Sequence, residues 1–554
     1  MKITLADYLV KKLTRLGISD FFGLPGDFNF NIIEAVESSL DAKWINCTNE
    51  LNAGYAADGY ARVKGFGAVV TTFGVGELSA INAIAGSYSE NVPVIKITGV
   101  PKTDMIKNNT ILHHNFQKPD YYAFERAYSN VVETTAFLDK ENAKREVDRI
   151  IDVMVKTRKP VYVSIPMDVC YLEVEDDIKD YTFTSDTEIL DKAVEHIVNV
   201  VNSSQKPVII ADFPVKRYNL KEKFIAFANS TKFPLTQMLM AKGLVDETKD
   251  SFMGTYLGDL SRGNAHQIVQ DSDCVITVGV LYSDLNTGGF SVMPDETFKV
   301  EIQSDSVVVE GIKYKNIWMG DLFDRLIGLI EENPHSYIND FAYEKTQITA
   351  EEPLKVEWLI KRLQEFLKEN DMLFVETGII SYASGLMKLP ENCLYNNQVL
   401  WGSIGWATPA VFGGAIADKT RRPILFTGEG SHQLTVQEVA NMIHHNIKPV
   451  IIVLNNAGYT IERILSKDPM DNFNDITNWN YSKLPELFNG GEFYTAQAKT
   501  NKEFEYALMN AAEFQKDKLC YIEAFTDKMD VPQVSLNLVQ NIKKNIKNKV
   551  LCDL

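Results

Sequence analysis

Two short polar segments, each following an apolar run, carry the most specific chemistry in this sequence. The run 423–427 leads into Gly428-Glu429-Gly430-Ser431, and the run 449–454 leads into Asn455-Asn456-Ala457-Gly458-Tyr459. Both runs predict buried strands, with one helix of about Leu434–His444 between them. Because the carboxyl ends of parallel strands meet at one sheet edge, the two segments are expected to lie together. Glycine turns open to phosphate, beside carboxylate and amide oxygens, predict a metal and diphosphate site.

Other polar residues with possible chemistry lie in the first third of the chain. Asp27 closes the turn Gly23-Leu24-Pro25-Gly26-Asp27, and Glu50 ends a predicted strand before a helix rich in small residues. A second glycine turn, Gly74-Val75-Gly76, follows another strand, and His113-His114 comes later. From the residues alone, Asp27 and Glu50 are equally compatible with helix capping, and the glycine turns with turns only.

A second histidine pair, His444-His445, ends the helix predicted between the two polar segments. Histidines at the last turn of a helix interact favourably with its dipole. We therefore interpret this pair as structural.

The elements that must position these residues alternate between strand-like runs and amphipathic helices, as a parallel sheet covered on both faces requires. With 554 residues, about three domains are expected. Charged or polar stretches at 171–187 and 331–353 suggest α/β domains at 1–180, 188–335 and 353–554, with mainly parallel sheets flanked by helices. The predicted strands are 20–23, 44–47, 68–73, 93–99, 160–166, 207–212, 274–280, 298–302, 372–376, 424–427, 450–454 and 520–524.

Composition narrows the class of protein. Hydrophobic residues make up 45% and the formal charge is −18, without a long basic run, which argues against a nucleic-acid partner. The basic segment 543–549 reads as a solvated helix face. The first residues lack a signal-peptide core, and no apolar run approaches membrane-spanning length. Six scattered cysteines without Cys-x-x-Cys spacing suit a reduced cytoplasm, so we expect a cytoplasmic protein without a membrane partner.

Five motifs in order give these residues a common interpretation. They are the turn 23–27, Glu50 within 49–62, His113-His114, Trp401-Gly402-Ser403-Ile404-Gly405, and Gly458-Tyr459-Thr460-Ile461-Glu462. Together they resemble the pyruvate and indolepyruvate decarboxylase family over almost the whole chain, and segments 428–431 and 455–459 resemble the thiamine diphosphate motif. The resemblance implies a thiamine diphosphate-dependent, non-oxidative 2-oxo acid decarboxylase with pyrimidine-binding, central and diphosphate-binding domains in that order.

The resemblance also implies a metal and cofactor site. Glu429, the Asn456 side chain and the Gly458 carbonyl would hold Mg²⁺. Glu429 is one methylene longer than the usual aspartate, and Mg²⁺ is strict about geometry. Ala457 and Ile379-Ile380 also replace polar family residues. The implied cofactor-binding residues are Glu50, Thr377, Gly402, Ile404, Gly428, Gly430, Ser431, His432, Asn456, Tyr459 and Thr460.

In the mechanism implied by the resemblance, Glu50 hydrogen-bonds the pyrimidine ring, the Gly402 carbonyl orients its amino group, and Ile404 bends the cofactor. Asp27, His114 and Glu462 would transfer protons, with His113 positioning them. The family takes the two halves of the site from different subunits, so a homodimer, commonly paired into a homotetramer, is implied.

The substrate pocket implied by the resemblance contains Leu285, Ser381, Ile461 and Leu465. Thr377 resembles the pyruvate enzymes, whereas Leu285 and Ser381 leave room for a longer acyl chain. We expect pyruvate turnover with tolerance for larger aliphatic or aromatic 2-oxo acids. Indolepyruvate, phenylpyruvate or branched-chain 2-oxo acid decarboxylation, an acetolactate synthase-like carboligase and an impaired cofactor-binding regulatory protein remain as alternatives.

Overall fold

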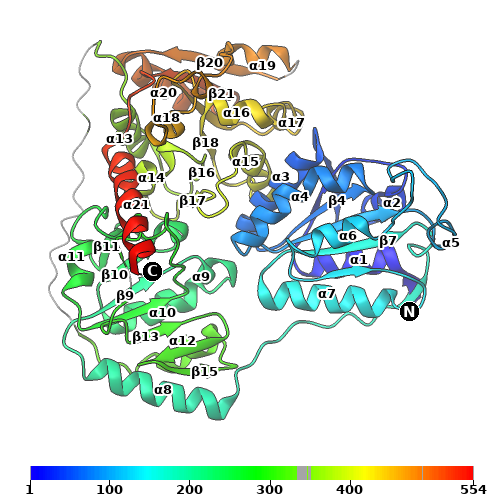
Figure 1. Cartoon of the computed structure of the whole chain (residues 1–554), viewed down its shortest axis with the longest axis horizontal. Helices are drawn as coiled ribbons and strands as arrows, with labels where there is room; N and C mark the ends of the chain where they lie inside the picture. Colours follow the sequence, from blue (N-terminus) through cyan, green and yellow to red (C-terminus); the bar gives the residue numbers. More distant parts are fainter. Residues whose placement is uncertain (1, 293, 334–345, 347–350, 489–490, 553–554) are drawn as a thin grey trace.

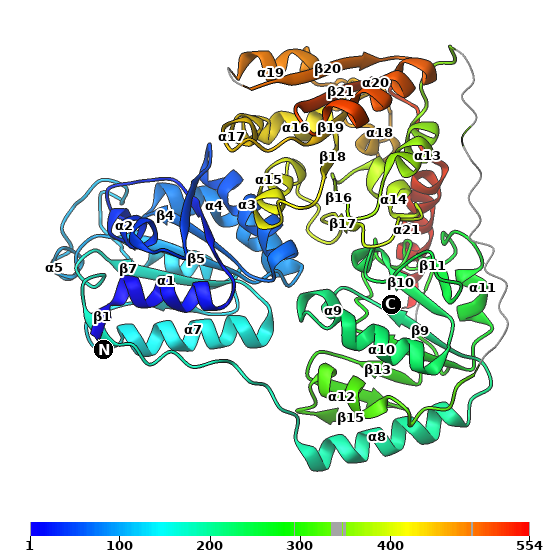
Figure 2. The same ribbon diagram turned by 180° about the vertical axis from the view of Figure 1, so that it is seen from behind.

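The chain folds into three α/β units, each built around one sheet, in a computed structural model that describes residues 2–292, 294–333, 346, 351–488 and 491–552, without the side chains of 546–552. Figures 1 and 2 show the first unit beside the third, with the central unit next to the third. Most of the predicted polar stretch 331–353 lies outside the described residues. None of the described helices has the length and apolarity needed to cross a bilayer.

The first sheet is parallel throughout and has the order β3-β2-β4-β5-β7-β6. Its strands are β2 (Asp20–Gly23), β3 (Lys43–Asn46), β4 (Gly67–Thr72), β5 (Val94–Val100), β6 (Thr135–Phe137) and β7 (Val161–Pro166). The flanking helices include α1 (Leu5–Arg15), α2 (Phe30–Ser38), α3 (Glu50–Lys64), α4 (Val75–Ser89) and α7 (Ala143–Thr157).

The predicted linker 171–187 is not wholly irregular. Its strand β8 (Glu173–Glu175) pairs antiparallel with β1 (Lys2–Thr4) at the start of the chain. Because this pairing is between residues far apart in sequence, the charged composition of the segment gave no sign of it.

The central sheet has the order β11-β10-β9-β12-β13-β14-β15. Its strands are β9 (Pro207–Ala211), β10 (Leu235–Met238), β11 (Phe252–Tyr256), β12 (Cys274–Val278), β13 (Val300–Ile302), β14 (Ser306–Val309) and β15 (Ile312–Lys315). The first five are parallel, whereas β14 and β15 continue the sheet antiparallel. These two strands are short and were not predicted. The central sheet is therefore mainly parallel, with an antiparallel end formed by β14 and β15.

The third sheet is parallel and has the order β17-β16-β18-β19-β21-β20. Its strands are β16 (Met372–Val375), β17 (Leu394–Asn396), β18 (Pro423–Gly428), β19 (Val450–Asn455), β20 (Phe493–Ala498) and β21 (Leu519–Phe525). The last helix, α21 (Gln533–Cys552), runs from this unit to the central one, where Asn541 donates to the carbonyl of Gly288 (Figure 1).

The single helix predicted between the two polar segments is in fact two, α16 (Glu429–Thr435) and α17 (Glu438–His444). The break follows the β-branched pair Thr435-Val436, where the Thr435 hydroxyl donates to the Gly405 carbonyl in another loop. The α16 helix therefore begins immediately at the predicted metal ligand.

Close helix packing joins the first and third units of the same chain. Helix α3 lies against α15 (Ala407–Ala417), and both are rich in small residues. A Cβ at Gly59 would lie 2.0 Å from the Ala410 carbonyl oxygen, and one at Gly413 would lie 1.8 Å from that of Ala56. Only glycine permits this approach, so the two sheets are held at a fixed distance.

Candidate cofactor and active site

The two polar segments of the third unit meet at the carboxyl edge of its sheet. Strands β18 and β19 are paired in register, with Gly428 opposite Leu454, so Glu429 and Asn456 emerge side by side. Glu429 is almost fully buried, and its Oε1 accepts the N–H of Gly458 at 2.8 Å and that of Asn456 at 3.3 Å. The glutamate arm therefore reaches across to the loop that carries the other implied ligands.

Polar atoms of Glu429, Asn456 and Gly458 lie close together at this loop. One terminal atom of the Asn456 amide lies 2.8 Å from the Gly458 carbonyl oxygen and 3.2 Å from Glu429 Oε1. If that atom is nitrogen, it donates to both; if it is oxygen, three oxygens converge without a proton between them. Adjacent ligands of octahedral Mg²⁺, bound at about 2.1 Å, are about 3.0 Å apart. The residues thus fit Mg²⁺.

The burial of Glu429 is a second indication of a cation site. It raises the pKa of Glu429 to about 7, although the N–H groups of Gly458, Asn456 and Gly430 act in the opposite direction. A bound cation would favour the ionised carboxylate.

A cleft adjoins these oxygens and has space for the diphosphate. Gly428 and Gly378 face it, and no atom lies within 4 Å of the position a Cβ would take at either residue. Gly430 is instead packed against the Tyr459 ring, 2.6 Å from where its Cβ would be. Substitution at Gly428 or Gly378 would put a side chain into the cleft. The lining residues are Thr377, Gly378, Ile379, Ile380, Ile404, Gly428, Glu429, Gly430, Ser431, Leu454, Asn456, Gly458, Tyr459, Thr460 and Ile461.

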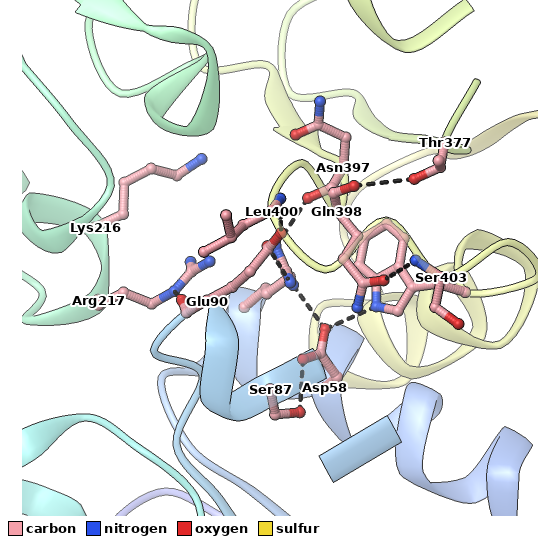
Figure 3. Close-up of polar contacts among 12 residues, drawn as sticks. Asp58, Ser87, Glu90, Lys216, Arg217, Thr377, Asn397, Gln398, Leu400 and Ser403 are labelled. Carbon is pink, nitrogen blue, oxygen red and sulfur yellow. Dashed lines mark hydrogen bonds and ion pairs between the residues drawn. The ribbon is translucent and has the colours of Figure 1, made fainter. Parts of the chain in front are cut away.

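The loop with Gly402 and Ile404 is fixed from two sides. Thr377 Oγ1 donates to the Gln398 carbonyl at 2.9 Å, and the Gln398 side chain accepts the Ser403 N–H at 2.8 Å (Figure 3). Gly402 has φ +62°, in the left-handed region that favours glycine. Ile404, on the same loop, lines the cleft.

The acid and histidines of the first unit form a separate cluster. His113 Nε2 lies 2.8 Å from Asp27 Oδ2, and the His113 and His114 ring centroids are 4.5 Å apart. His114 has φ +66°, and its carbonyl would lie 2.1 Å from a Cβ at Gly74. The second glycine turn therefore makes room for the histidine backbone. Asp27 and the two histidines also lie close enough to hold a metal ion together, but about half of the Asp27 and His113 side chains is exposed.

Glu50 is the first residue of α3 and is half-buried beside the glycine turn 74–76. A Cβ at Gly76 would lie 3.1 Å from Glu50 Oε1, so a larger residue here would crowd the Glu50 carboxylate. Glu50 therefore lies at a strand-to-helix junction, as predicted, with its carboxylate near the glycine turn. The N-cap of the helix is Asn49, whose side chain accepts the Asn52 N–H.

Comparison with known proteins decides the family. Three thiamine pyrophosphate enzyme models match in order: the N-terminal TPP binding domain at residues 3–124, the central domain at 194–317 and the C-terminal TPP binding domain at 380–524. The chain is 36% identical to pyruvate decarboxylase of Candida glabrata over 546 residues, 96% of each chain. It is 35% identical to pyruvate decarboxylase isozyme 1 of Saccharomyces cerevisiae over 556 residues, 98% of each chain.

The chain belongs to the pyruvate decarboxylase family of thiamine diphosphate enzymes. It is a 2-oxo acid carboxy-lyase with thiamine diphosphate and its usual Mg²⁺ partner as cofactors. The predicted family, fold class and cofactors are confirmed.

Several residues implied by membership of this decarboxylase family do not reach the cleft. His432 is fully buried, with Nδ1 2.8 Å from the Thr408 hydroxyl, and burial lowers its pKa to about 3. His432 is not among the residues that line the cleft. Ser431, Tyr459 and Thr460 do line it.

Of the implied substrate-pocket residues, one lines the cleft and the others do not. Ile461 lines the cleft, whereas Glu462 and Leu465 are exposed on the same short helix, α18 (Thr460–Leu465). Ser381 is buried and accepts from the Asn397 amide at 3.2 Å. Leu285 packs with an apolar group near the central unit. In one chain these decarboxylase residues do not form a single pocket.

Two buried glutamates escaped the sequence analysis. Glu376 accepts the N–H groups of Thr377, Gly405 and Ala407, so it holds the loop after Ile404, and burial raises its pKa to about 7. Glu438 accepts from the Thr48 hydroxyl at 2.7 Å and the Asn52 amide at 2.8 Å, which fixes the start of α3 near Glu50. Glu376 follows β16 and Glu438 begins α17, and, apart from Thr377, the partners named here are distant in sequence.

Proposed function

We propose that this enzyme converts pyruvate to acetaldehyde and CO2, and accepts larger 2-oxo acids more slowly. The observation that carries the proposal is the convergence of Glu429, Asn456 and Gly458 oxygens beside a glycine-lined cleft, in a chain aligned end to end with pyruvate decarboxylases. Thiamine diphosphate, when bound, supplies the electron sink for the carbanion left by loss of CO2.

In this proposal the third unit holds the cofactor. Glu429, the Asn456 side chain and the Gly458 carbonyl bind Mg²⁺, while the backbone at Gly428, Gly430 and Ser431 faces the diphosphate. The Gly402 carbonyl, together with Glu50 from the first unit of a second copy, would orient the pyrimidine ring, and Ile404 would contact the bound cofactor. The bonds of Glu376 to Gly405 and Ala407 keep this loop in place.

Proton transfer falls to the first-unit cluster. Asp27 and His114, with Glu462 from the third unit, exchange protons with the substrate, and the 2.8 Å contact to Asp27 positions His113. Asp27, His113 and His114 lie close together, so we assign the proton steps to the set rather than to one residue.

The complete site requires two chains. All residues lining the third-unit cleft come from the third unit, whereas Asp27 and the histidines are half-exposed on the first. We propose a homodimer in which the first unit of one copy covers the cleft of its partner, with pairing of dimers into a homotetramer. Covering the cleft would also remove water, which strengthens electrostatic interactions inside it.

The substrate proposal is tested by product analysis. The holoenzyme would be given pyruvate, 2-oxoisovalerate, phenylpyruvate and indolepyruvate with added thiamine diphosphate and Mg²⁺. We expect aldehyde and CO2 from pyruvate with the highest kcat/KM, and a change of about 10- to 200-fold or less per added methylene. Absence of pyruvate turnover would refute the proposal, and acetolactate or acetoin as the main product would identify a carboligase.

An impaired regulatory protein would show weak or absent binding of thiamine diphosphate and Mg²⁺ by calorimetry. The fit of the Glu429 oxygen cluster to Mg²⁺ argues against that alternative. A cytoplasmic location is also proposed, because the five cysteines among the described side chains are buried and unpaired, as in a reducing compartment.

A further inference from the structure

A fully buried lysine lies close to the glycine turn 74–76 of the first unit. Lys96 is in β5, and its Nζ donates to Thr71 Oγ1 at 2.8 Å, to Thr98 Oγ1 at 2.7 Å and to the Ile97 carbonyl at 3.0 Å. All three acceptors are uncharged. Such a cation is costly to bury, so its place in the core calls for a physical reason.

The hydrogen bonds indicate that Lys96 is an ammonium group. The Thr71 hydroxyl donates its own proton to the Thr72 carbonyl at 3.0 Å, so towards Lys96 it is an acceptor. The Thr98 hydroxyl is likewise hydrogen-bonded to the Glu77 carboxylate. Three donated hydrogen bonds need the three protons of a charged lysine, because the neutral amine has only two.

A buried carboxylate on α4 partly balances this charge. Glu77 Oε1 accepts the Gly74 N–H at 2.7 Å, and Oε2 accepts the Tyr162 hydroxyl at 2.6 Å. Burial raises the pKa of Glu77, and the Lys96 charge acts in the opposite direction. Burial lowers the pKa of Lys96, against the effects of Glu77 and then of Glu50. The first unit therefore keeps two opposite charges in its core.

The third charged group at this turn is Glu50, at the start of α3. A Cβ at Gly76 would lie 3.1 Å from Glu50 Oε1 and 3.3 Å from Thr71 Cβ, so the carboxylate and Thr71 flank the same glycine. Thr71 in turn accepts from Lys96. A single side chain thus separates the Lys96 charge from the Glu50 carboxylate, in a buried region where water screens the interaction little.

We propose that Lys96 is a positioning residue for Glu50, whose ionised carboxylate it favours, and that Glu77 offsets part of this effect. The inference rests on the proposed function, in which Glu50 faces the pyrimidine ring of thiamine diphosphate. An opposite charge nearby stabilises an ionised carboxylate. Turnover should therefore persist to a lower pH than it would without Lys96.

The other titratable groups around the turn stay unchanged in the test. The Lys96 Nζ is 5.8 Å from the ring centroid of Tyr128 and 5.9 Å from that of Tyr162. Burial raises the pKa of both tyrosines well above the usual value, so they remain neutral. Further groups near the turn or the start of α3 are Asp27, His113, His114 and Glu438. Lys96 and Glu77 are the charges to vary.

Calorimetry of cofactor binding measures the effect without any substrate. Thiamine diphosphate is titrated into the Mg²⁺-saturated protein at several pH values, in two buffers of different ionisation enthalpy, which gives the number of protons taken up. The part of the uptake that disappears in Glu50→Gln belongs to Glu50. In Lys96→Met the pH midpoint of this part should rise by at least about 0.5 on the pH scale, and in Glu77→Gln it should fall. Each variant is compared with the same variant carrying Glu50→Gln.

The double substitution Lys96→Met/Glu77→Gln covers the case in which Lys96→Met alone does not fold, because that variant leaves Glu77 buried without its counter-charge. Its midpoint should lie above that of Glu77→Gln, from which it differs only at position 96. Lys43→Met is the matched control: Lys43 is exposed at the amino end of β3 in the same sheet, so its loss should leave the midpoint at the wild-type value.

Three results would overturn the role of Lys96. They are a wild-type midpoint in Lys96→Met, equal midpoints in the double variant and Glu77→Gln, and an equal rise in Lys43→Met. Wild-type proton uptake in Glu50→Gln would instead remove Glu50 from the cofactor, and this inference with it.

Discussion

The first and third sheets have the same strand order, yet the polar residues at their carboxyl edges differ in how far they are buried. Numbered within each unit, both sheets are ordered 2-1-3-4-6-5. In the third sheet, Glu429 follows the third strand and is 1% exposed. Its Oε1 accepts the N–H groups of Asn456 and Gly458. In the first, Asp27 follows the first strand, and its side chain is 49% exposed beside His113 at 57%.

This difference shows that a shared sheet topology does not by itself bury the polar residues at its edge. A parallel sheet brings the loops after its strands to one edge in both units. The third unit then buries its oxygens under its own helices, whereas the first leaves its acid and histidines facing outward. We interpret the exposed cluster as the half that a second copy of the chain must cover. The following predictions test the contrast between the two edges, beginning with the largest effect.

Glu50→Gln removes the carboxylate that the proposal places on the pyrimidine ring. Because the third-unit cleft is untouched, kcat should fall by about 10³-fold while thiamine diphosphate and Mg²⁺ still bind. Steady-state kinetics and calorimetric titration measure the two effects separately. A loss of less than tenfold would show that Glu50 has only a helix-terminus role.

Glu429→Gln should weaken Mg²⁺ binding more than it lowers turnover, the reverse of what we expect for Glu50→Gln. Loss of the charged ligand should raise the Mg²⁺ concentration for half-maximal activity at least about 100-fold, with smaller changes at saturating Mg²⁺. Glu429→Asp should be intermediate, because a shorter arm cannot keep both bonds to Asn456 and Gly458. The exposed Glu486→Gln is the control for charge. Equal Mg²⁺ dependence in Glu429→Gln and wild type would remove Glu429 from the metal site.

Asp27→Asn should affect turnover without affecting Mg²⁺. The amide keeps a hydrogen bond to His113 but loses the proton-accepting carboxylate, so kcat/KM should fall about 10- to 100-fold and the pH profile should change shape. Asp120→Asn, at an exposed ion pair in the same unit, is the matched control. A profile of wild-type shape would indicate that Asp27 only supports the loop.

Mixing the Glu50→Gln and Glu429→Gln variants is the most direct test of a site shared by two chains, with activity measured at a Mg²⁺ concentration that leaves Glu429→Gln inactive. In a dimer of one Glu50→Gln chain and one Glu429→Gln chain, one site contains both substitutions and the other contains neither. Random reassembly of equal amounts should therefore restore about one quarter of wild-type activity. The measurement is activity after unfolding-free subunit exchange, with each variant alone as the control. No recovery, despite exchange demonstrated by native mass spectrometry, would mean that each chain builds its own site.

Much of the local structure could be predicted because it depends on neighbouring residues. Apolar runs ending in glycine turns located β2, β18 and β19, and the position of Glu50 after a strand located the start of α3. Short strands such as β14 and β15 were missed, because four residues have no distinctive periodicity, and the strands are held by pairing of β14 with β13 and of β15 with β14. The break between α16 and α17 was missed for a related reason: the Gly405 carbonyl that binds Thr435 lies 30 residues away.

The sequence by itself determined the family, the cofactors and the residue types at the two sheet edges, because those depend on motifs that need only their own order along the chain. The tertiary structure decided which side chains face the cleft. It buried His432 in the core and left Leu285 and Ser381 out of the lining of the cleft. It also placed Glu376 where it accepts the N–H groups of Gly405 and Ala407, next to Ile404. In the first unit it brought Lys96 and Glu50 to one glycine turn. Burial and charge matching are properties of contacts between distant segments, so no local pattern could reveal them.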